Sequence, residues 1–163
     1  MKNYKKKAFT LIELLIVIAL LGALAAGLLA AIDPFEQLKK GADTSVRGQA
    51  ETLYNASIAY YAQRNALPTG LASGTLSQPA SALTAGINEL ANAGELKADF
   101  VALAGGKLSS IVISVPNNQK IIVCYQPQSK AFRNDQYTKY NSTGATRAGC
   151  PSGTSASCYQ CFQ

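Results

Sequence analysis

The sequence contains no histidine, no tryptophan and a single methionine among its 163 residues. Without histidine there is no His-based catalytic triad, no histidine general base and no histidine metal ligand, which removes most hydrolytic and zinc chemistries. Charged residues are also scarce, at 15% against 48% hydrophobic residues. We therefore expect no enzyme activity, no cofactor, no metal and no small-molecule substrate.

Positive charge is concentrated at the N-terminus. The chain has 15 Lys and Arg against 9 Asp and Glu, a net charge of +6, and four of the positive charges are Lys2, Lys5, Lys6 and Lys7. Without these four the balance is 11 against 9, so the rest of the chain is nearly neutral. A basic cluster next to an apolar segment is retained on the cytoplasmic side of a membrane. Everything after the apolar segment is expected outside the cytoplasm, where disulfides persist.

A long uncharged run follows the basic cluster. From Leu14 to Ile32 there are 19 consecutive residues without a charge. At 1.5 Å per residue this run makes a helix of about 28 Å, which is enough to cross the hydrocarbon of a bilayer. It fits a single-pass anchor, or a secretory signal peptide cut before Ala26. Neither interpretation explains Glu13, because an ionised carboxylate near the bilayer centre costs about 2.5 to 3.5 kcal/mol.

Glu13 acquires a role if the chain is cut between Ala8 and Phe9. The cut creates an α-ammonium at Phe9, inside the same apolar layer, and Glu13 of a neighbouring copy would pair with it at low dielectric. Residues 9 and 13 also lie one turn apart on one helix, so an intrachain pair is the competing arrangement. The sequence does not distinguish the two.

Residues 5–8 (KKKA) and 9–13 (FTLIE), followed by the apolar run, closely resemble the prepilin leader and first helix of type IV pilins and pseudopilins. The resemblance implies that a membrane prepilin peptidase cuts after Ala8 and that the new amine of Phe9 is N-methylated. It further implies that Phe9, Thr10 and Glu13 guide assembly into a helical filament of identical subunits. The family usually has glycine before the cut, whereas this chain has the similarly small Ala8.

The resemblance also implies a location and partners. The precursor would sit in the cytoplasmic membrane with its C-terminal head outside the cytoplasm, and the assembled form would be an extracellular pilus. Its partners would be the prepilin peptidase, the pilus assembly machinery and other copies of the chain. Motility and cell adhesion are the associated functions.

Three residues make the apolar helix easy to bend. Gly22 and Gly27 each lower helix propensity by about 1 kcal/mol relative to alanine, and Pro34 removes the hydrogen bond to the Ala30 carbonyl. Pilins often lose helicity in this region in the fibre, so the resemblance implies local melting here. Small residues also let membrane helices approach closely, and the two interpretations are compatible.

Beyond Pro34, apolar residues recur at three- and four-residue spacing from Phe35 and Leu38 to Tyr60. This pattern predicts an amphipathic helix to about Asn65, continuous with the apolar helix apart from at most a kink. Residues 66–82 are rich in Pro, Gly, Ser and Thr and predict a loop. A short helix follows with Leu83, Ile87 and Leu90 in period, and Gly94 is its expected C-cap.

Two alternating apolar segments, Ile111–Val115 and Ile121–Tyr125, flank a turn at 116–119 and predict an antiparallel hairpin. A further strand is expected near Ala131–Asn134. A lone hairpin is marginal in water, so one face of a sheet of three or four strands should cover the outer half of the long helix. The predicted fold class is α+β, with a disulfide-tied C-terminal tail.

This prediction divides the chain into five parts: leader 1–8, membrane or filament-core helix 9–33, amphipathic outer helix 34–65, loop with short helix 66–98, and sheet head with tail 99–163.

The four cysteines are Cys124, Cys150, Cys158 and Cys161. The C-x-x-C pair lacks the second pair of a zinc site and the strand-to-helix setting of a thioredoxin-type motif. Structural disulfides are the better interpretation. Four cysteines allow three pairings and the sequence does not choose, although we favour Cys124 with Cys161 and Cys150 with Cys158. A bridge in such a loop contributes about 2 to 4 kcal/mol.

The leading hypothesis is a type IV pilus subunit. The alternatives are a pseudopilin of a type II secretion or competence system, a membrane-anchored binding module that does not polymerise, and a secreted domain. Basic residues in the tail would allow contacts with nucleic-acid phosphates, but a solvated surface is the simpler interpretation. They are Lys130, Arg133, Lys139 and Arg147.

Overall fold

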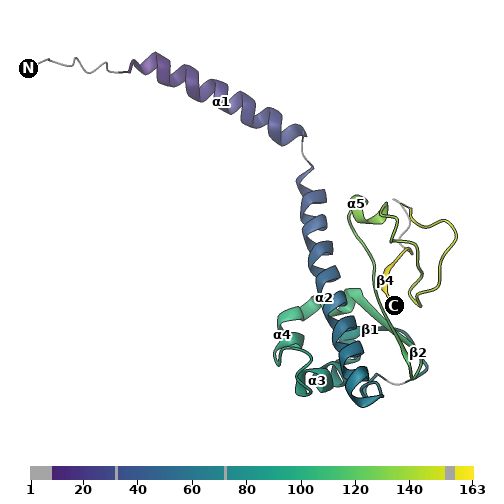
Figure 1. The fold of residues 1–163 in the computed structure, drawn as a ribbon. Helices are drawn as coiled ribbons and strands as arrows, with labels where there is room; N and C mark the ends of the chain where they lie inside the picture. Colours follow the sequence, from purple (N-terminus) through teal and green to yellow (C-terminus); the bar gives the residue numbers. More distant parts are fainter. Residues whose placement is uncertain (1–8, 32, 72, 153–156) are drawn as a thin grey trace, which may run out of the picture. The chain divides into compact units, whose positions relative to one another are not determined.

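The structure is a computed structural model, and it describes residues 9–31, 33–71, 73–152 and 157–163 (Figure 1). The chain divides into two compact units, residues 1–35 and 36–163. The predicted leader, with Ala8, and Ile32 lie outside the described residues.

The first unit contains helix α1, Leu11–Ala31. Its stretch Leu11–Leu29 has a mean hydropathy of 2.6 and is not buried anywhere in the single chain. Among the described residues it is the one helix that is long and apolar enough to cross a membrane. Water does not tolerate an apolar surface of this size, so lipid or other apolar chains must cover it.

Helix α2, Pro34–Arg64, has a start of its own. Pro34 occupies its first position, and the Asp33 carboxylate accepts the N–H of Phe35 at 3.1 Å. An aspartate cap followed by proline is a typical helix start, because proline has no N–H to leave unpaired. The expected single helix with at most a kink is therefore wrong: α1 ends at Ala31 and a second helix begins at Pro34.

The amphipathic pattern of α2 also begins later than expected. Phe35 and Leu38 are 72% and 71% exposed, and the buried face starts at Asp43. From there Val46, Ala50, Leu53, Ala56 and Tyr60 enter the core. The outer part of α2 therefore packs on the head as predicted, whereas its first two turns have no core to cover them.

The head contains an antiparallel sheet of four strands in the order β1-β2-β3-β4. The predicted hairpin is confirmed as β2, Ile111–Asn117, and β3, Lys120–Tyr125, whose apolar residues are buried except for Val112 and Pro116. Strand β1, Thr75–Pro79, pairs with β2 inside the region expected to be a loop, so that expectation is wrong. It is an edge strand, a position where proline is tolerated.

The last strand is β4, Gln160–Phe162, which pairs with β3. The strand expected at Ala131–Asn134 is wrong, because this segment forms the single helical turn α5, Lys130–Arg133. Ser129 caps α5, with its Oγ accepting the Phe132 N–H at 3.4 Å. Local capping therefore prevails over a short apolar pattern. The observed elements still give the predicted α+β fold class, with a long outer helix and a small antiparallel sheet.

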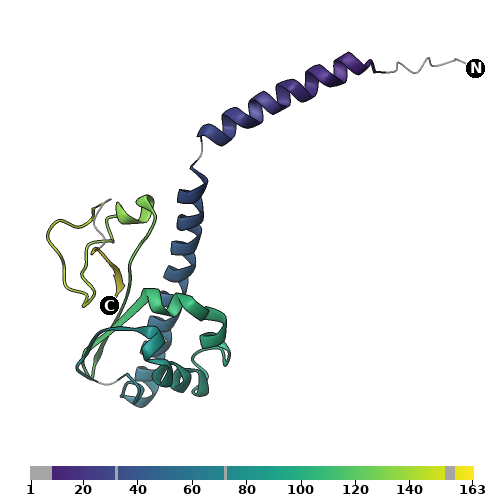
Figure 2. The same cartoon turned by 180° about the vertical axis from the view of Figure 1, so that it is seen from behind.

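Helices α3, Thr84–Asn92, and α4, Phe100–Ala104, and the 3₁₀ turns Ala80–Ala82 and Gly105–Ser110 complete the head. The sequence predicted α3 and the left-handed Gly94 after it, but not α4 or the 3₁₀ turns. Figure 2 shows the head from behind: in both views α3 and α4 lie on one side of α2, and α5 and β4 lie on the other.

Glu89 of α3 holds the outer end of the head together. Its carboxylate accepts the Tyr60 hydroxyl at 2.5 Å, and the N–H and hydroxyl of Thr69 at 2.8 and 2.7 Å. The Tyr60 hydroxyl, followed by the Thr69 hydroxyl, lowers the pKa of Glu89 below its usual 4.5. One carboxylate thus joins α2, α3 and the segment between them.

Candidate functional site

The start of α1 is built around Thr10 and Glu13. The N–H and the hydroxyl of Thr10 donate to Oε2 of Glu13 at 3.0 and 2.9 Å. In return, the Glu13 N–H donates to the Thr10 hydroxyl oxygen at 3.3 Å, and the Thr10 carbonyl accepts the N–H of Leu14. This reciprocal arrangement is a capping box, which satisfies donors that a helix start otherwise leaves unpaired.

The capping box gives Glu13 a partner that the sequence analysis missed. The signal was readable, since Thr-x-x-Glu before an apolar run is the signature of this cap. Glu13 was assigned either to a neighbour's α-ammonium or to that of its own chain. In the single chain the carboxylate is held by Thr10, so the cost of placing it in an apolar layer would be partly offset before any other copy arrives.

Phe9 and the predicted cut after Ala8 lie directly before the capping box. The side chain of Phe9 is 87% exposed and directly precedes Thr10. The proposed cut after Ala8 lies partly outside the described residues and stays a prediction. Removal of the leader would place the new ammonium next to the capping box, within reach of its carboxylate.

The flexibility assigned to Gly22, Gly27 and Pro34 also stays a prediction. Helix α1 runs without interruption through both glycines. A Cβ built at either glycine meets no atom within 4 Å, so no contact inside the chain requires glycine there. Pro34 starts α2, as described above.

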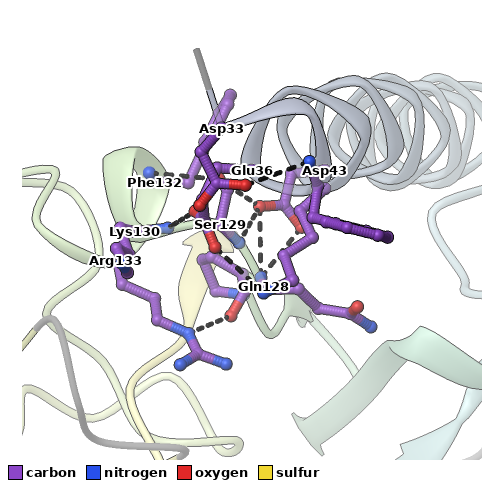
Figure 3. Close-up of polar contacts among 11 residues, drawn as sticks. Asp33, Glu36, Asp43, Gln128, Ser129, Lys130, Phe132 and Arg133 are labelled. Carbon is purple, nitrogen blue, oxygen red and sulfur yellow. Dashed lines mark hydrogen bonds and ion pairs between the residues drawn. The ribbon is translucent and has the colours of Figure 1, made fainter. Parts of the chain in front are cut away.

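A second polar cluster joins α2 to the C-terminal tail (Figure 3). Asp43 is only 2% exposed, and its carboxylate accepts the N–H of Gln128 at 2.9 Å, the N–H of Ser129 at 2.8 Å and the Ser129 hydroxyl at 2.6 Å. Two turns earlier, Glu36 accepts the N–H of Lys130 at 2.9 Å. We call Glu36 and Asp43 the carboxylate clamp, because they hold the start of α5 against α2.

The electrostatics around Glu36 favour its ionised carboxylate. The Lys130 N–H, followed by the Lys39 ammonium at 2.9 Å from Oε1, lowers the pKa of Glu36. Hydrogen bonds from backbone N–H groups stabilise the charged form of a carboxylate. The contact between Glu36 and Lys130 is therefore expected to persist at neutral pH.

Two disulfides complete the tail. Cys124 of β3 is bonded to Cys161 of β4, and Cys150 is bonded to Cys158. This is the pairing that we favoured among the three. All four cysteines of the chain are thus joined, and none is a free thiol.

Comparison with known proteins yields one match. Residues 3–29 match the family described as the prokaryotic N-terminal methylation motif. The matched segment covers part of the basic leader, the capping box and most of α1, and it does not extend into the head. No curated protein and no solved structure matches the chain.

Proposed function

We propose, starting from the type IV pilin or pseudopilin type of prepilin signal that this chain carries, that the chain is a structural subunit of a type IV pilus. The observation behind this proposal is the methylation motif placed directly on a helix whose apolar stretch is unburied in the single chain. The prepilin peptidase cuts after Ala8, and the amine of Phe9 is methylated. The mature subunits then assemble through α1.

The need to cover α1 supports assembly. Lipid covers the helix in the precursor, and the α1 helices of other copies cover it in the filament. On assembly Glu13 exchanges the neutral donors of Thr10 for the α-ammonium of a neighbour's Phe9. A charged donor forms a stronger hydrogen bond than a neutral one, so the exchange favours the assembled state.

The proposed location follows from the same segment. The precursor lies in the cytoplasmic membrane with the head on the outer side, and the assembled protein is extracellular. Two disulfides in the head are consistent with an oxidising compartment.

Proteins with this signal are structural rather than catalytic, so we propose no enzyme activity. The same signal serves pseudopilins of secretion or competence systems, which remain the alternative together with a non-polymerising anchored module.

The N-terminus of the mature protein, determined by mass spectrometry, tests the proposal. N-methylated Phe9 supports assembly after processing. An intact Met1 supports a permanent membrane tether, and a terminus at Ala26 supports a secreted domain. Electron microscopy of surface filaments labelled through the head then separates a pilus from a short pseudopilus.

Two variants of Glu13 separate its cap role from its pairing role. Glu13→Gln keeps a side-chain oxygen for the Thr10 donors, since glutamine also serves in a capping box, but it removes the charge. Glu13→Ala removes both. We expect both variants to be cleaved normally and to form few filaments, whereas the matched change Glu51→Gln on α2 should leave filaments unchanged. Abundant filaments from Glu13→Gln would contradict the charge-pairing role.

A further inference from the structure

All of the net positive charge after the leader comes from the tail. Residues 126–163 contain four basic residues and one acidic residue, Asp135, whereas acidic and basic residues balance between residues 48 and 125. The four basic residues, which we call the basic tail set, are Lys130, Arg133, Lys139 and Arg147. The charge of the head is therefore one-sided.

Contacts within the tail keep the basic tail set together. Lys130 and Arg133 lie on α5, and the Thr138 hydroxyl donates to the Phe132 carbonyl at 2.6 Å, which ties the following segment to α5. The Arg147 N–H donates to the Lys139 carbonyl at 2.9 Å, which places these two residues side by side. The basic residues thus belong to a folded segment rather than to a loose end.

Exposed tyrosines accompany the charges. Tyr137 is 55% exposed, and the ammonium of Lys139 lies 5.6 Å from the ring centre of Tyr140. Tyrosine is enriched at both membrane–water interfaces, and basic side chains are attracted to anionic headgroups. The same mixture also suits single-stranded nucleic acid, so composition alone does not identify the partner.

The carboxylate clamp attaches the basic tail set to the part of α2 that directly follows α1. Lys130 N is 2.9 Å from the Glu36 carboxylate, and Glu36 follows Ala31, the end of α1, by five residues. Five residues reach at most about 18 Å even when fully extended. The headgroup layer on each side of a bilayer is itself about 5 to 8 Å thick. If α1 spans the membrane, this length of chain allows α5 to reach the headgroups.

We propose that the basic tail set docks on anionic phospholipid headgroups of the membrane that holds α1. Docking fixes the head against the outer leaflet while the subunit waits for assembly, and extraction of α1 breaks it. The inference rests on the part of the proposed function that places α1 in a membrane. It requires neither the cut after Ala8 nor polymerisation.

A site-specific probe tests this docking on the unprocessed full-length chain in lipid vesicles. Because all native cysteines are paired, Ala131→Cys supplies a single thiol on the exposed side of α5 for a fluorophore. A second labelled protein carries Asn118→Cys in the turn between β2 and β3. Headgroup-attached quencher lipids report the proximity of each label to the membrane, and vesicle flotation first confirms that the chain is inserted.

We expect the label at residue 131 to be quenched in vesicles with about a third phosphatidylglycerol, and much less in pure phosphatidylcholine. The label at residue 118 should be quenched in neither. Salt at about 1 M shortens the Debye length to about 3 Å and should abolish the difference. Failure of flotation would refute the membrane location itself, whereas flotation with equal quenching in both lipids would refute only the docking.

The matched variants change two lysines each. Lys130→Gln with Lys139→Gln leaves both tail arginines, whose side chains donate to the carbonyls of Pro127 and Ser157. Each basic residue near an anionic surface changes the equilibrium constant for docking about fivefold, so this pair should lower that constant about 25-fold. The control pair, Lys97→Gln with Lys120→Gln, removes the same charge from exposed positions outside the tail and should have no effect.

Two further outcomes would overturn the proposal. One is an equal loss of quenching in the control pair, which would mean that only total charge matters. The other is tight binding of a DNA oligonucleotide that depends on Lys130 and Lys139 when the 131 label shows no lipid dependence. That result would assign the surface to nucleic acid.

Discussion

Replacement of Asp43 by alanine tests the carboxylate clamp most directly. The carboxylate is 2% exposed and accepts the N–H groups of Gln128 and Ser129 and the Ser129 hydroxyl. Hydrogen bonds to a charged group contribute about 1.5 to 3 kcal/mol each, and the cost of burying the carboxylate offsets part of their sum. We therefore expect Asp43→Ala to lower the free energy of unfolding by about 3 to 5 kcal/mol, because it leaves the N–H groups of Gln128 and Ser129 without their acceptor.

Such a loss is large relative to the whole stability of a domain of this size, which is about 5 to 15 kcal/mol. Asp43→Asn keeps one acceptor oxygen and should lose about half as much. The chain has eight tyrosines and no tryptophan, so the near-ultraviolet signal of buried tyrosines follows unfolding in urea, with the full chain in detergent micelles.

Asp99→Ala, at an exposed position, is the matched control and should change stability by less than about 0.5 kcal/mol. Ser129→Ala, alone and combined with Asp43→Ala, completes a double-mutant cycle. The two effects should be strongly non-additive, because both residues share one hydrogen bond. An Asp43→Ala protein as stable as the control would show that the clamp does not hold the tail.

Two further predictions concern acid and the disulfides. Because its hydroxyl partners hold the pKa of Glu89 below 4.5, this carboxylate contributes stability at neutral pH that is lost as the pH falls through the lowered folded-state pKa. Urea midpoints measured from pH 7 to pH 3 should therefore fall less steeply in Glu89→Gln than in the unchanged protein, and parallel curves would contradict this. Cys124 and Cys161 are 37 residues apart and Cys150 and Cys158 only 8. Loop entropy then predicts a loss of about 4 kcal/mol when the first pair is changed to serine and about 2.5 kcal/mol for the second, and thermal unfolding would contradict this by showing the reverse order.

The sequence alone predicted the helices and strands whose apolar residues follow a regular spacing. Helix α1 follows from an uninterrupted apolar run, and the β2–β3 hairpin follows from alternating apolar residues around a turn. Strand β1 was missed because its residues, TLSQP, do not alternate between apolar and polar. They form a strand because they pair with β2. Asp33 followed by Pro34 is a standard signal for the start of a new helix, but the sequence analysis interpreted this position as a kink.

The polar contacts were harder to predict for a physical reason. The capping box of Thr10 and Glu13 is local, and the Thr-x-x-Glu spacing predicts it. The partners of Asp43 are backbone N–H groups 85 and 86 residues away, which carry no residue-specific signal. Side chains that bind distant backbone groups become visible only when the fold brings them together.

The bond between Cys124 and Cys161 has a consequence for how this protein can change over time. The intervening residues form a covalent ring. The disulfide closes this ring between β3 and β4, and Asp43 of α2 holds it at Gln128 and Ser129. Lengthening a closed loop adds little entropy cost, so insertions in the outer part of the ring should leave the hydrophobic core intact. The ring can therefore diversify its outer face without a new scaffold.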